Sequence, residues 1–158
     1  MISQFNFPTT IRFGAGVVKE LGAYLQKNNW VRPLIVTDPT VRELSFFKGI
    51  VTDLQNAGIS VEVFSDIHKN PVKSDVYKGS DAYDQTQRDS IIGIGGGAGL
   101  DVARAILLRI NHREDLFKYD DLIGGDVYVT NDVPPFITIP TTAGTGSEVG
   151  RSAIIADD

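Results

Sequence analysis

The sequence contains no cysteine, which excludes disulfide bonds, thiolate metal sites and a cysteine nucleophile. No apolar run approaches the ~20 residues needed to cross a bilayer, and Met1–Pro8 lacks the features of a signal peptide. Basic residues are also few, since 15 Lys and Arg face 20 Asp and Glu, for a net charge of −5. This charge repels nucleic-acid phosphates and anionic lipids, so we expect a cytoplasmic protein with neither nucleic-acid nor membrane partners.

Histidine is scarce as well. His68 and His112 stand far apart and lack the paired spacing of a metal site, so we expect both to be surface residues. The sequence therefore predicts no metal ligand and no catalytic residue in this chain. A group of four acidic residues is interpreted as a solvated face: Glu114, Asp115, Asp120 and Asp121.

Strand-like and helix-like hydrophobic patterns alternate along the chain. Its 158 residues suit one domain. Strands that alternate with helices predict βαβ units, and therefore an α/β fold with a doubly wound, Rossmann-like parallel sheet over residues 1–158. The expected strands are Leu34–Val36, Val61–Phe64, Ile91–Ile94 and Phe136–Ile139, and the expected helical faces are Val17–Leu25, Leu44–Leu54 and Leu100–Ile110.

The first residues follow a different pattern. Phe5–Phe7 and Thr10–Phe13 are separated by Pro8 and followed by Gly14, which is typical of an edge hairpin or an N-terminal β arm. An exposed strand edge invites pairing with another copy of the chain. We therefore expect a homodimer that forms through this arm.

A glycine-rich segment from Gly95 to Asp101 follows a predicted strand and precedes a helix, where ligands of open α/β sheets bind. Glycines allow close approach of the backbone, and the free N–H groups of a helix start attract anions. We expect Gly96, Gly97 and Ala98 to contact a pyrophosphate, although a plain tight turn is the alternative. Asp101 is interpreted either as a ligand contact or as a cap in the first helical turn.

A second small, polar loop, Pro140–Glu148, follows the last predicted strand. Thr141, Thr142 and Thr145 offer hydroxyl and N–H groups with little bulk, which suits an adenine–ribose–phosphate ligand. The alternative is a polar loop in which Ser147 caps a helix. Two such loops after two parallel strands favour a nucleotide site.

Asp38 ends another predicted strand and precedes Pro39, a residue that suits the first turn of a helix. Its carboxylate can accept hydrogen bonds from the ribose hydroxyls of an adenosine and would repel a 2′-phosphate, which favours NAD over NADP. A helix N-cap is an equally good interpretation of this position.

These segments resemble the iron-containing (group III) alcohol dehydrogenases, in order and over nearly the whole chain. The resemblance implies an N-terminal domain that binds NAD(P), followed by a helical domain that holds a divalent metal, usually iron, through one Asp and three His. The matching segments are Phe13–Gly16 with Leu21–Gly22, Thr37–Pro39 with Ala57–Ile59, Ile94–Asp101 and, most specifically, Ile139–Val149. By matching position, the cofactor contacts fall on Asp38, Asn70, Gly97, Ala98, Thr141, Thr142, Thr145 and, near the nicotinamide ring, Ile154.

The sequence departs from the family pattern at several positions. The chain stops at Asp158, before any metal ligand, so we expect the helical metal-binding domain to be absent. Within the matching segments, Ala98 stands where Ser is usual, Val72 where Thr is usual and Arg104 where Lys is usual, while Gly150 and Ser152 replace Thr and Phe.

The resemblance implies a function for the full-length parent. Such an enzyme transfers a hydride between NAD and its substrate, an alcohol or aldehyde, while iron polarises the substrate oxygen. We expect the 158-residue chain to be the NAD-binding domain and to be inactive alone. The alternative is a truncated, non-catalytic module for nucleotide binding or oligomerisation.

Overall fold

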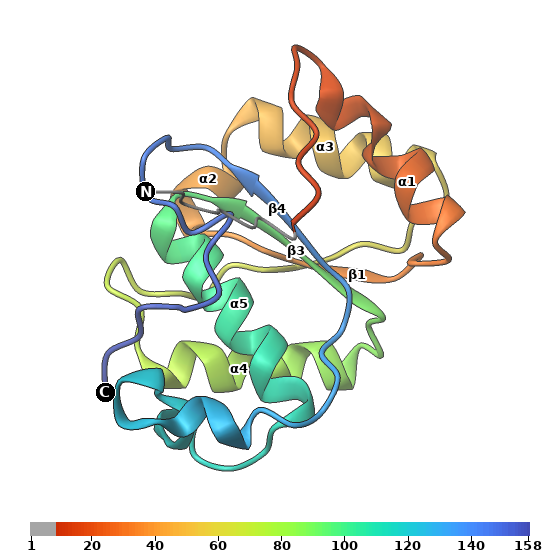
Figure 1. Cartoon of the computed structure of the whole chain (residues 1–158). Helices are drawn as coiled ribbons and strands as arrows, with labels where there is room; N and C mark the ends of the chain where they lie inside the picture. Colours follow the sequence, from red (N-terminus) through yellow and green to blue (C-terminus); the bar gives the residue numbers. More distant parts are fainter. Residues whose placement is uncertain (1–8) are drawn as a thin grey trace, which may run out of the picture.

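A four-stranded parallel sheet forms the centre of the computed structural model, which describes residues 9–158 (Figure 1). The strands lie in the order β2-β1-β3-β4, and the register pairs Ile35 of β1 with Val63 and with Ile92. The predicted parallel α/β fold is confirmed, and each strand lies where a hydrophobic run predicted it. The strands are β1 (Pro33–Val36), β2 (Glu62–Phe64), β3 (Ser90–Gly95) and β4 (Phe136–Pro140).

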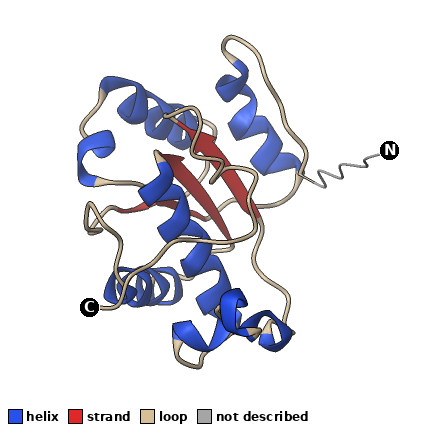
Figure 2. Cartoon of the chain, turned by 60° about the vertical axis from the view of Figure 1, so that its left-hand side comes forward, coloured by secondary structure: helices blue, strands red, loops and turns tan. Residues whose placement is uncertain are grey.

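Helices cover both faces of the sheet, as a doubly wound fold requires (Figures 1 and 2). One face carries α1 (Leu21–Lys27) and α3 (Ser45–Asn56), and the other carries α4 (Lys73–Gln85) and α5 (Gly97–Asn111). The remaining elements are short: η1 (Val17–Glu20), α2 (Pro39–Arg42), η2 (Leu116–Tyr119), η3 (Asp121–Ile123) and η4 (Gly125–Tyr128).

Two hydrophobic cores lie on opposite faces of the sheet because alternate strand residues point to opposite sides. Leu34 and Val36 pack among the residues of α4 and α5, whereas Ile35 packs among those of α1 and α3. β1 and β3 are buried along their whole lengths. These two central strands therefore form a rigid base for the loops at their carboxyl ends.

Helix α4 was not predicted from the sequence. Its buried positions include Val76, Gly79, Ser80 and Tyr83, and small or polar residues weaken its apolar periodicity. The glycine has a packing role, since a β-carbon on Gly79 would lie 2.2 Å from Cδ1 of Ile106 in α5. The close approach of α4 to α5 thus requires Gly79, and the same glycine interrupts the apolar pattern by which a helix is recognised in the sequence.

The surface prediction for His112 is wrong. This side chain is only 3% exposed, and both ring nitrogens have backbone partners: the carbonyl of Leu108 at 3.0 Å from Nδ1 and the N–H of Asn131 at 3.0 Å from Nε2. Burial is tolerated because the neutral ring can donate through Nδ1 and accept through Nε2. His68 is exposed, as expected.

The predicted acidic face is largely solvated. Glu114, Asp115 and Asp121 are exposed, while Asp120 is partly buried. Asp115 and Asp120 also cap η2 and η3, where each carboxylate accepts a backbone N–H.

Part of the predicted N-terminal arm, including Phe5–Phe7, lies outside the described residues. Thr10–Phe13 forms no strand within this chain, and Phe13 is 99% exposed. A β-strand needs a hydrogen-bonding neighbour, and residues 9–158 provide none for this segment. No helix within that range is long and apolar enough to cross a membrane.

Candidate cofactor site

The candidate site lies at the carboxyl ends of β1 and β3. These neighbouring strands lead in opposite directions across the sheet, β1 to β2 at one edge and β3 to β4 at the other. Such a switch point opens a crevice in which α/β proteins bind ligands. The glycine-rich segment follows β3 and Asp38 follows β1, so the topology brings these two predicted sites together.

The glycine-rich segment leads directly into a long helix. The alternative interpretation, a plain tight turn, therefore does not account for the helix start that the glycines form. Gly96 is the N-cap of the 15-residue helix α5 and supplies no side-chain cap. The N–H groups of Gly97, Ala98 and Gly99 have no partner within the helix, because the first turn of any α-helix leaves its donors free. These donors and the positive end of the helix dipole suit a pyrophosphate.

The threonine-rich loop packs directly on the glycine-rich segment. The N–H of Thr141 donates to the carbonyl of Gly95 at 2.9 Å. A β-carbon on Gly96 would lie 3.2 Å from Oγ1 of Thr142, and one on Gly97 would lie 3.4 Å from Cβ of Thr145. The absence of side chains at these glycines therefore leaves space beside the helix start, and the threonines border it.

Ser147 does not cap a helix. It lies in a turn in which the N–H groups of Val149 and Gly150 both donate to the carbonyl of Gly146. Its own N–H donates to Oγ1 of Thr145 at 3.3 Å. The alternative interpretation, a polar loop in which Ser147 caps a helix, is thus correct about the loop and wrong about the cap.

Asp38 uses its two carboxylate oxygens differently. Oδ1 accepts the N–H groups of Thr40 and Val41, both at 2.9 Å, so the N-cap interpretation is confirmed. Oδ2 faces the glycine-rich segment and would lie 3.4 Å from a β-carbon on Gly95. Capping therefore leaves one oxygen directed at the crevice, and the ribose interpretation remains compatible with the cap.

Asp101 is not a first-turn cap. It is the fifth residue of α5, is 9% exposed, and accepts the N–H of Ile154 through Oδ2 at 3.3 Å. The helix begins earlier than the cap interpretation assumed, because the glycines themselves form its first turn. The carboxylate thus binds the segment that bears Ile154, whose side chain is 79% exposed.

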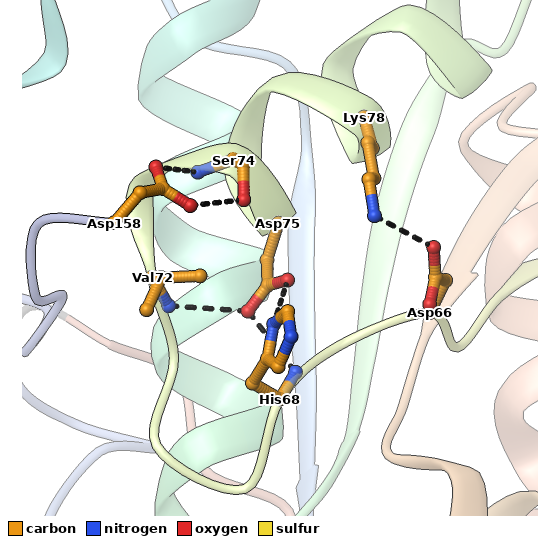
Figure 3. Close-up of polar contacts among 7 residues, drawn as sticks. All are labelled: Asp66, His68, Val72, Ser74, Asp75, Lys78 and Asp158. Carbon is orange, nitrogen blue, oxygen red and sulfur yellow. Dashed lines mark hydrogen bonds and ion pairs between the residues drawn. The ribbon is translucent and has the colours of Figure 1, made fainter.

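Asn70 lies in the exposed loop before α4, and a buried carboxylate organises this loop (Figure 3). Asp75 is 0% exposed and accepts three hydrogen bonds: from the N–H groups of His68 and Val72, both at 3.1 Å, and from the His68 ring at 2.8 Å. Val72 has no side-chain oxygen with which to cap the helix. The Asp75 carboxylate instead joins the loop to the first turn, together with the bond from the Asp75 N–H to the Val72 carbonyl.

The C-terminal segment runs beside this loop. The N–H of Ala156 donates to the carbonyl of Pro71 at 2.9 Å, and its carbonyl accepts the N–H of Lys73 at 3.0 Å. The Asp158 carboxylate binds both the N–H and the hydroxyl of Ser74 (Figure 3).

The predicted cofactor contacts fall into two groups. Asp38, Gly96, Gly97, Ala98, Thr141, Thr142 and Thr145 surround the start of α5, whereas Asn70 and Ile154 lie in two adjoining segments farther along the same edge.

Comparison with known proteins accounts for this arrangement. The family model for iron-containing alcohol dehydrogenases matches residues 8–158. The chain belongs to the iron-containing alcohol dehydrogenase family.

Among its relatives, the choline dehydrogenase of Bacillus subtilis (strain 168) is 34% identical over 154 residues, which are 98% of this chain and 38% of that protein. A 1,3-propanediol oxidoreductase structure superposes with a TM-score of 0.82 at 30% identity, over 94% of this chain and 38% of the other. A sulfoacetaldehyde reductase from Bifidobacterium kashiwanohense in complex with NAD⁺ has a TM-score of 0.75 at 26% identity, over 100% of this chain and 44% of the other. The chain thus spans about 40% of the length of these relatives.

The residues of this family member fit NAD better than they fit a metal. Gly96 and Gly97 leave a space beside the start of α5 that the threonines border, here called the cradle. The buried hydroxyl of Thr37, at the end of β1, has no hydrogen-bond partner. By contrast, residues 9–158 contain no group of three or more His, Cys, Asp or Glu that could hold a metal ion. A hollow of about 390 Å³ lies elsewhere, at residues 11–17 and Glu20.

Sequence reasoning did not assign Arg104 to the site. Its side chain leaves α5 and hydrogen-bonds to the backbone carbonyls of Ser147 and Ser152. Burial lowers the pKa of this guanidinium, and the carboxylates of Asp101 and Glu148 oppose that shift. The sequence did offer a signal for Arg104, because this charged residue stands in an otherwise apolar stretch of the predicted helix.

Proposed function

We propose that this chain is the NAD-binding domain of a metal-dependent alcohol dehydrogenase. The observation that carries the proposal is the direct contact between the threonine-rich loop and the glycine-rich segment over the free start of α5. Backbone N–H groups of Gly97 to Gly99 would bind the pyrophosphate, and Oδ2 of Asp38 would accept the ribose hydroxyls. The bound NAD would supply the hydride acceptor for alcohol oxidation.

The lack of a basic patch is consistent with this mode of binding. Helix ends and backbone donors hold anions without a net positive charge, and this chain carries a net charge of −5. The threonine hydroxyls would orient the nucleotide and exclude water from one side of it. The alcohol or aldehyde substrate and the iron site belong to the proposal for the full-length parent, whose length the chain covers by about 40%.

The second candidate is a non-catalytic module that binds nucleotide or mediates oligomerisation. One observation favours it: residues 9–158 contain no group of three or more His, Cys, Asp or Glu that could hold a metal ion. Both candidates have the same fold. Nucleotide binding would exclude a purely oligomeric module, whereas a non-catalytic nucleotide-binding module would differ from the enzyme domain only in the activity of the full-length parent.

The test is substitution of Ala98, the second residue of α5. Ala98→Asp places a negative charge where the pyrophosphate would lie, yet an acidic side chain in the first turn stabilises a helix by about 0.3–1 kcal/mol. We expect Ala98→Asp to abolish NAD⁺ binding without lowering the urea midpoint. Ala98→Ser adds a donor and should tighten binding by about 0.5–1.5 kcal/mol.

NAD⁺ titration followed by amide NMR shifts measures both variants against the wild type. The matched control is Gly49→Ala in α3, where a β-carbon meets no atom within 4 Å. NAD⁺ affinity that is unchanged in Ala98→Asp would refute the assignment of this helix start as the pyrophosphate site. Absence of NAD⁺ binding in the wild type would instead favour the oligomeric module.

A further inference from the structure

Arg104 connects α5 to the end of the threonine-rich loop (Pro140–Glu148) and to the segment that follows it. One guanidinium nitrogen donates to the carbonyl of Ser152 at 3.0 Å, and the other donates to the carbonyl of Ser147. The guanidinium also lies over the ring of Phe136 in β4, 5.7 Å from its centroid. A single side chain thus holds two points of one segment, five residues apart, against the helix.

This segment determines where the threonine-rich loop ends. Oγ of Ser147 would lie 3.5 Å from a β-carbon on Gly97, at the first residue of α5. Other side chains make one hydrogen bond each to the segment: the Thr138 hydroxyl donates to the Glu148 carbonyl at 3.2 Å, Asp121 accepts the Ser152 hydroxyl at 3.1 Å, and Asp101 accepts the Ile154 N–H at 3.3 Å. Arg104 therefore differs from these side chains because it makes two hydrogen bonds to the segment. It belongs to α5, the helix whose first turn would bind the pyrophosphate.

Two properties of arginine suit this position. Its nitrogens diverge in a fixed plane, so they can reach two separate carbonyls, whereas a lysine ammonium is a compact point charge on a flexible stem. The guanidinium also lies near the carboxylates of Asp101 and Glu148, and Oε2 of Glu148 is buried with no hydrogen-bond partner. Loss of the cation would leave this buried carboxylate without a compensating charge.

We propose that Arg104 is a positioning residue of the NAD site, which holds the threonine-rich loop at its working distance from the start of α5. The proposal rests on the proposed function for its effect on NAD⁺, but its effect on the loop can be measured without any ligand. Arg104 does not touch the nucleotide in this scheme. It acts by fixing Ser147, and through it the edge of the cradle at Gly97.

The experiment compares Arg104→Met, Arg104→Lys and Arg109→Met in the 158-residue chain. Met keeps the apolar stem and removes every donor, whereas Lys keeps the charge and can serve one carbonyl. Arg109 is the matched control. It lies on the same helix, donates to the carbonyl of His112 at 3.1 Å and covers the Tyr77 ring at 4.8 Å, but it contacts neither loop.

Hydrogen exchange of the ligand-free chain is the first readout. We expect exchange at residues 141–153 to rise by about tenfold in Arg104→Met, because one or two charged hydrogen bonds are lost, and to rise less in Arg104→Lys. Arg109→Met should leave these residues unchanged. Unchanged exchange there in Arg104→Met would overturn the proposal.

NAD⁺ affinity is the second readout. We expect Arg104→Met to weaken binding by about tenfold, with partial recovery in Arg104→Lys and wild-type affinity in Arg109→Met, for the same loss of charged hydrogen bonds. A general loss of stability would affect Arg109→Met as well, and equal weakening in both Met variants would overturn the positioning role. A wild-type chain that binds no NAD⁺ would contradict the proposed function, and hydrogen exchange would then decide the role of Arg104 alone.

Discussion

Replacement of Asp38 by Asn separates the two roles that the structure gives this side chain. The amide oxygen of Asn can still accept the N–H groups of Thr40 and Val41, and Asn is as good an N-cap as Asp. The negative charge that faces Gly95 is lost. We therefore expect Asp38→Asn to change cofactor selectivity while the start of α2 stays intact.

The magnitude follows from the interactions that change. With NAD, the variant exchanges a charged acceptor for a neutral one, and with NADP it removes repulsion of the 2′-phosphate. A hydrogen bond to a charged group contributes about 1.5–3 kcal/mol, against about 1 kcal/mol for a neutral one. The preference for NAD over NADP should therefore narrow by about 1–3 kcal/mol, roughly 5- to 150-fold.

Asp38→Gly removes both the charge and the cap oxygen. Because Gly is itself tolerated at N-caps, the loss of stability should be only about a few tenths of a kcal/mol, and the change in selectivity should match that of Asp38→Asn. The control is Glu43→Gln, which removes the same charge at the end of α2, where Glu43 is exposed and pairs with Lys48.

Titration of each variant with NAD⁺ and NADP⁺ measures the selectivity, and urea unfolding measures the cap. A ratio of the two affinities that stays unchanged in both Asp38 variants would refute the ribose assignment. An equal change in Glu43→Gln would show that only the overall negative charge matters.

Three further predictions concern packing, assembly and activity. Gly79→Ala should destabilise the fold by roughly 1 kcal/mol, because overpacking against Ile106 (about 1–3 kcal/mol) exceeds the gain in helix propensity (about 1 kcal/mol); an unchanged urea midpoint would contradict this. The chain should form a homodimer through its N-terminal arm, where Ile11 and Phe13 are exposed, so light scattering should give a dimeric mass for the wild type and a monomeric mass for Ile11→Lys/Phe13→Lys; a wild-type monomer at micromolar concentration would refute it. The isolated 158-residue chain should bind NAD⁺ weakly and produce no NADH from primary or secondary alcohols with added iron, zinc or manganese. The reason is that a catalytic metal needs three or more fixed ligands, and residues 9–158 contain no such group. Metal-dependent turnover by a chain of verified mass would prove this expectation wrong.

The elements with strong periodicity could be predicted from the sequence. The runs around Ile35 and Ile92 are continuous and apolar because both faces of a central parallel strand are buried, and this pattern identifies such strands directly. The helical spacing of α5 was equally clear. Once the strands were identified, the rule for α/β sheets placed the functional loops at their carboxyl ends, and the structure has them there.

What the sequence could not reveal depended on contacts between distant residues. Helix α4 packs through Gly79 and Ser80, and no hydrophobic pattern distinguishes such a face from a loop. His112 can be buried because the Leu108 carbonyl and the Asn131 N–H form hydrogen bonds with its two ring nitrogens. Both partners are backbone groups, so the residue types at these positions do not reveal them. Propensity and periodicity describe local preference, whereas these positions are decided by tertiary packing.

The candidate site shows the same division. The cap at Asp38 is local, since its donors lie two and three residues away, and it was one of the two interpretations that the sequence allowed. Asp101 and Arg104 instead bind backbone atoms of Ile154, Ser147 and Ser152, far along the chain. Any residue can supply a backbone carbonyl or N–H, so such partners leave no mark in the sequence.

The contacts that shape the two nucleotide loops all arise within this chain. The threonine-rich loop is held by the carbonyl of Gly95 and by Arg104, and the N–H groups proposed to bind the pyrophosphate belong to the first turn of α5. No second domain is needed to form these contacts, so the geometry of the loops should be independent of the rest of a longer enzyme. Polarisation of an alcohol oxygen by a metal needs a group of ligands that residues 9–158 do not contain. The proposed binding of NAD by these loops can therefore be tested in the isolated chain, apart from any chemistry.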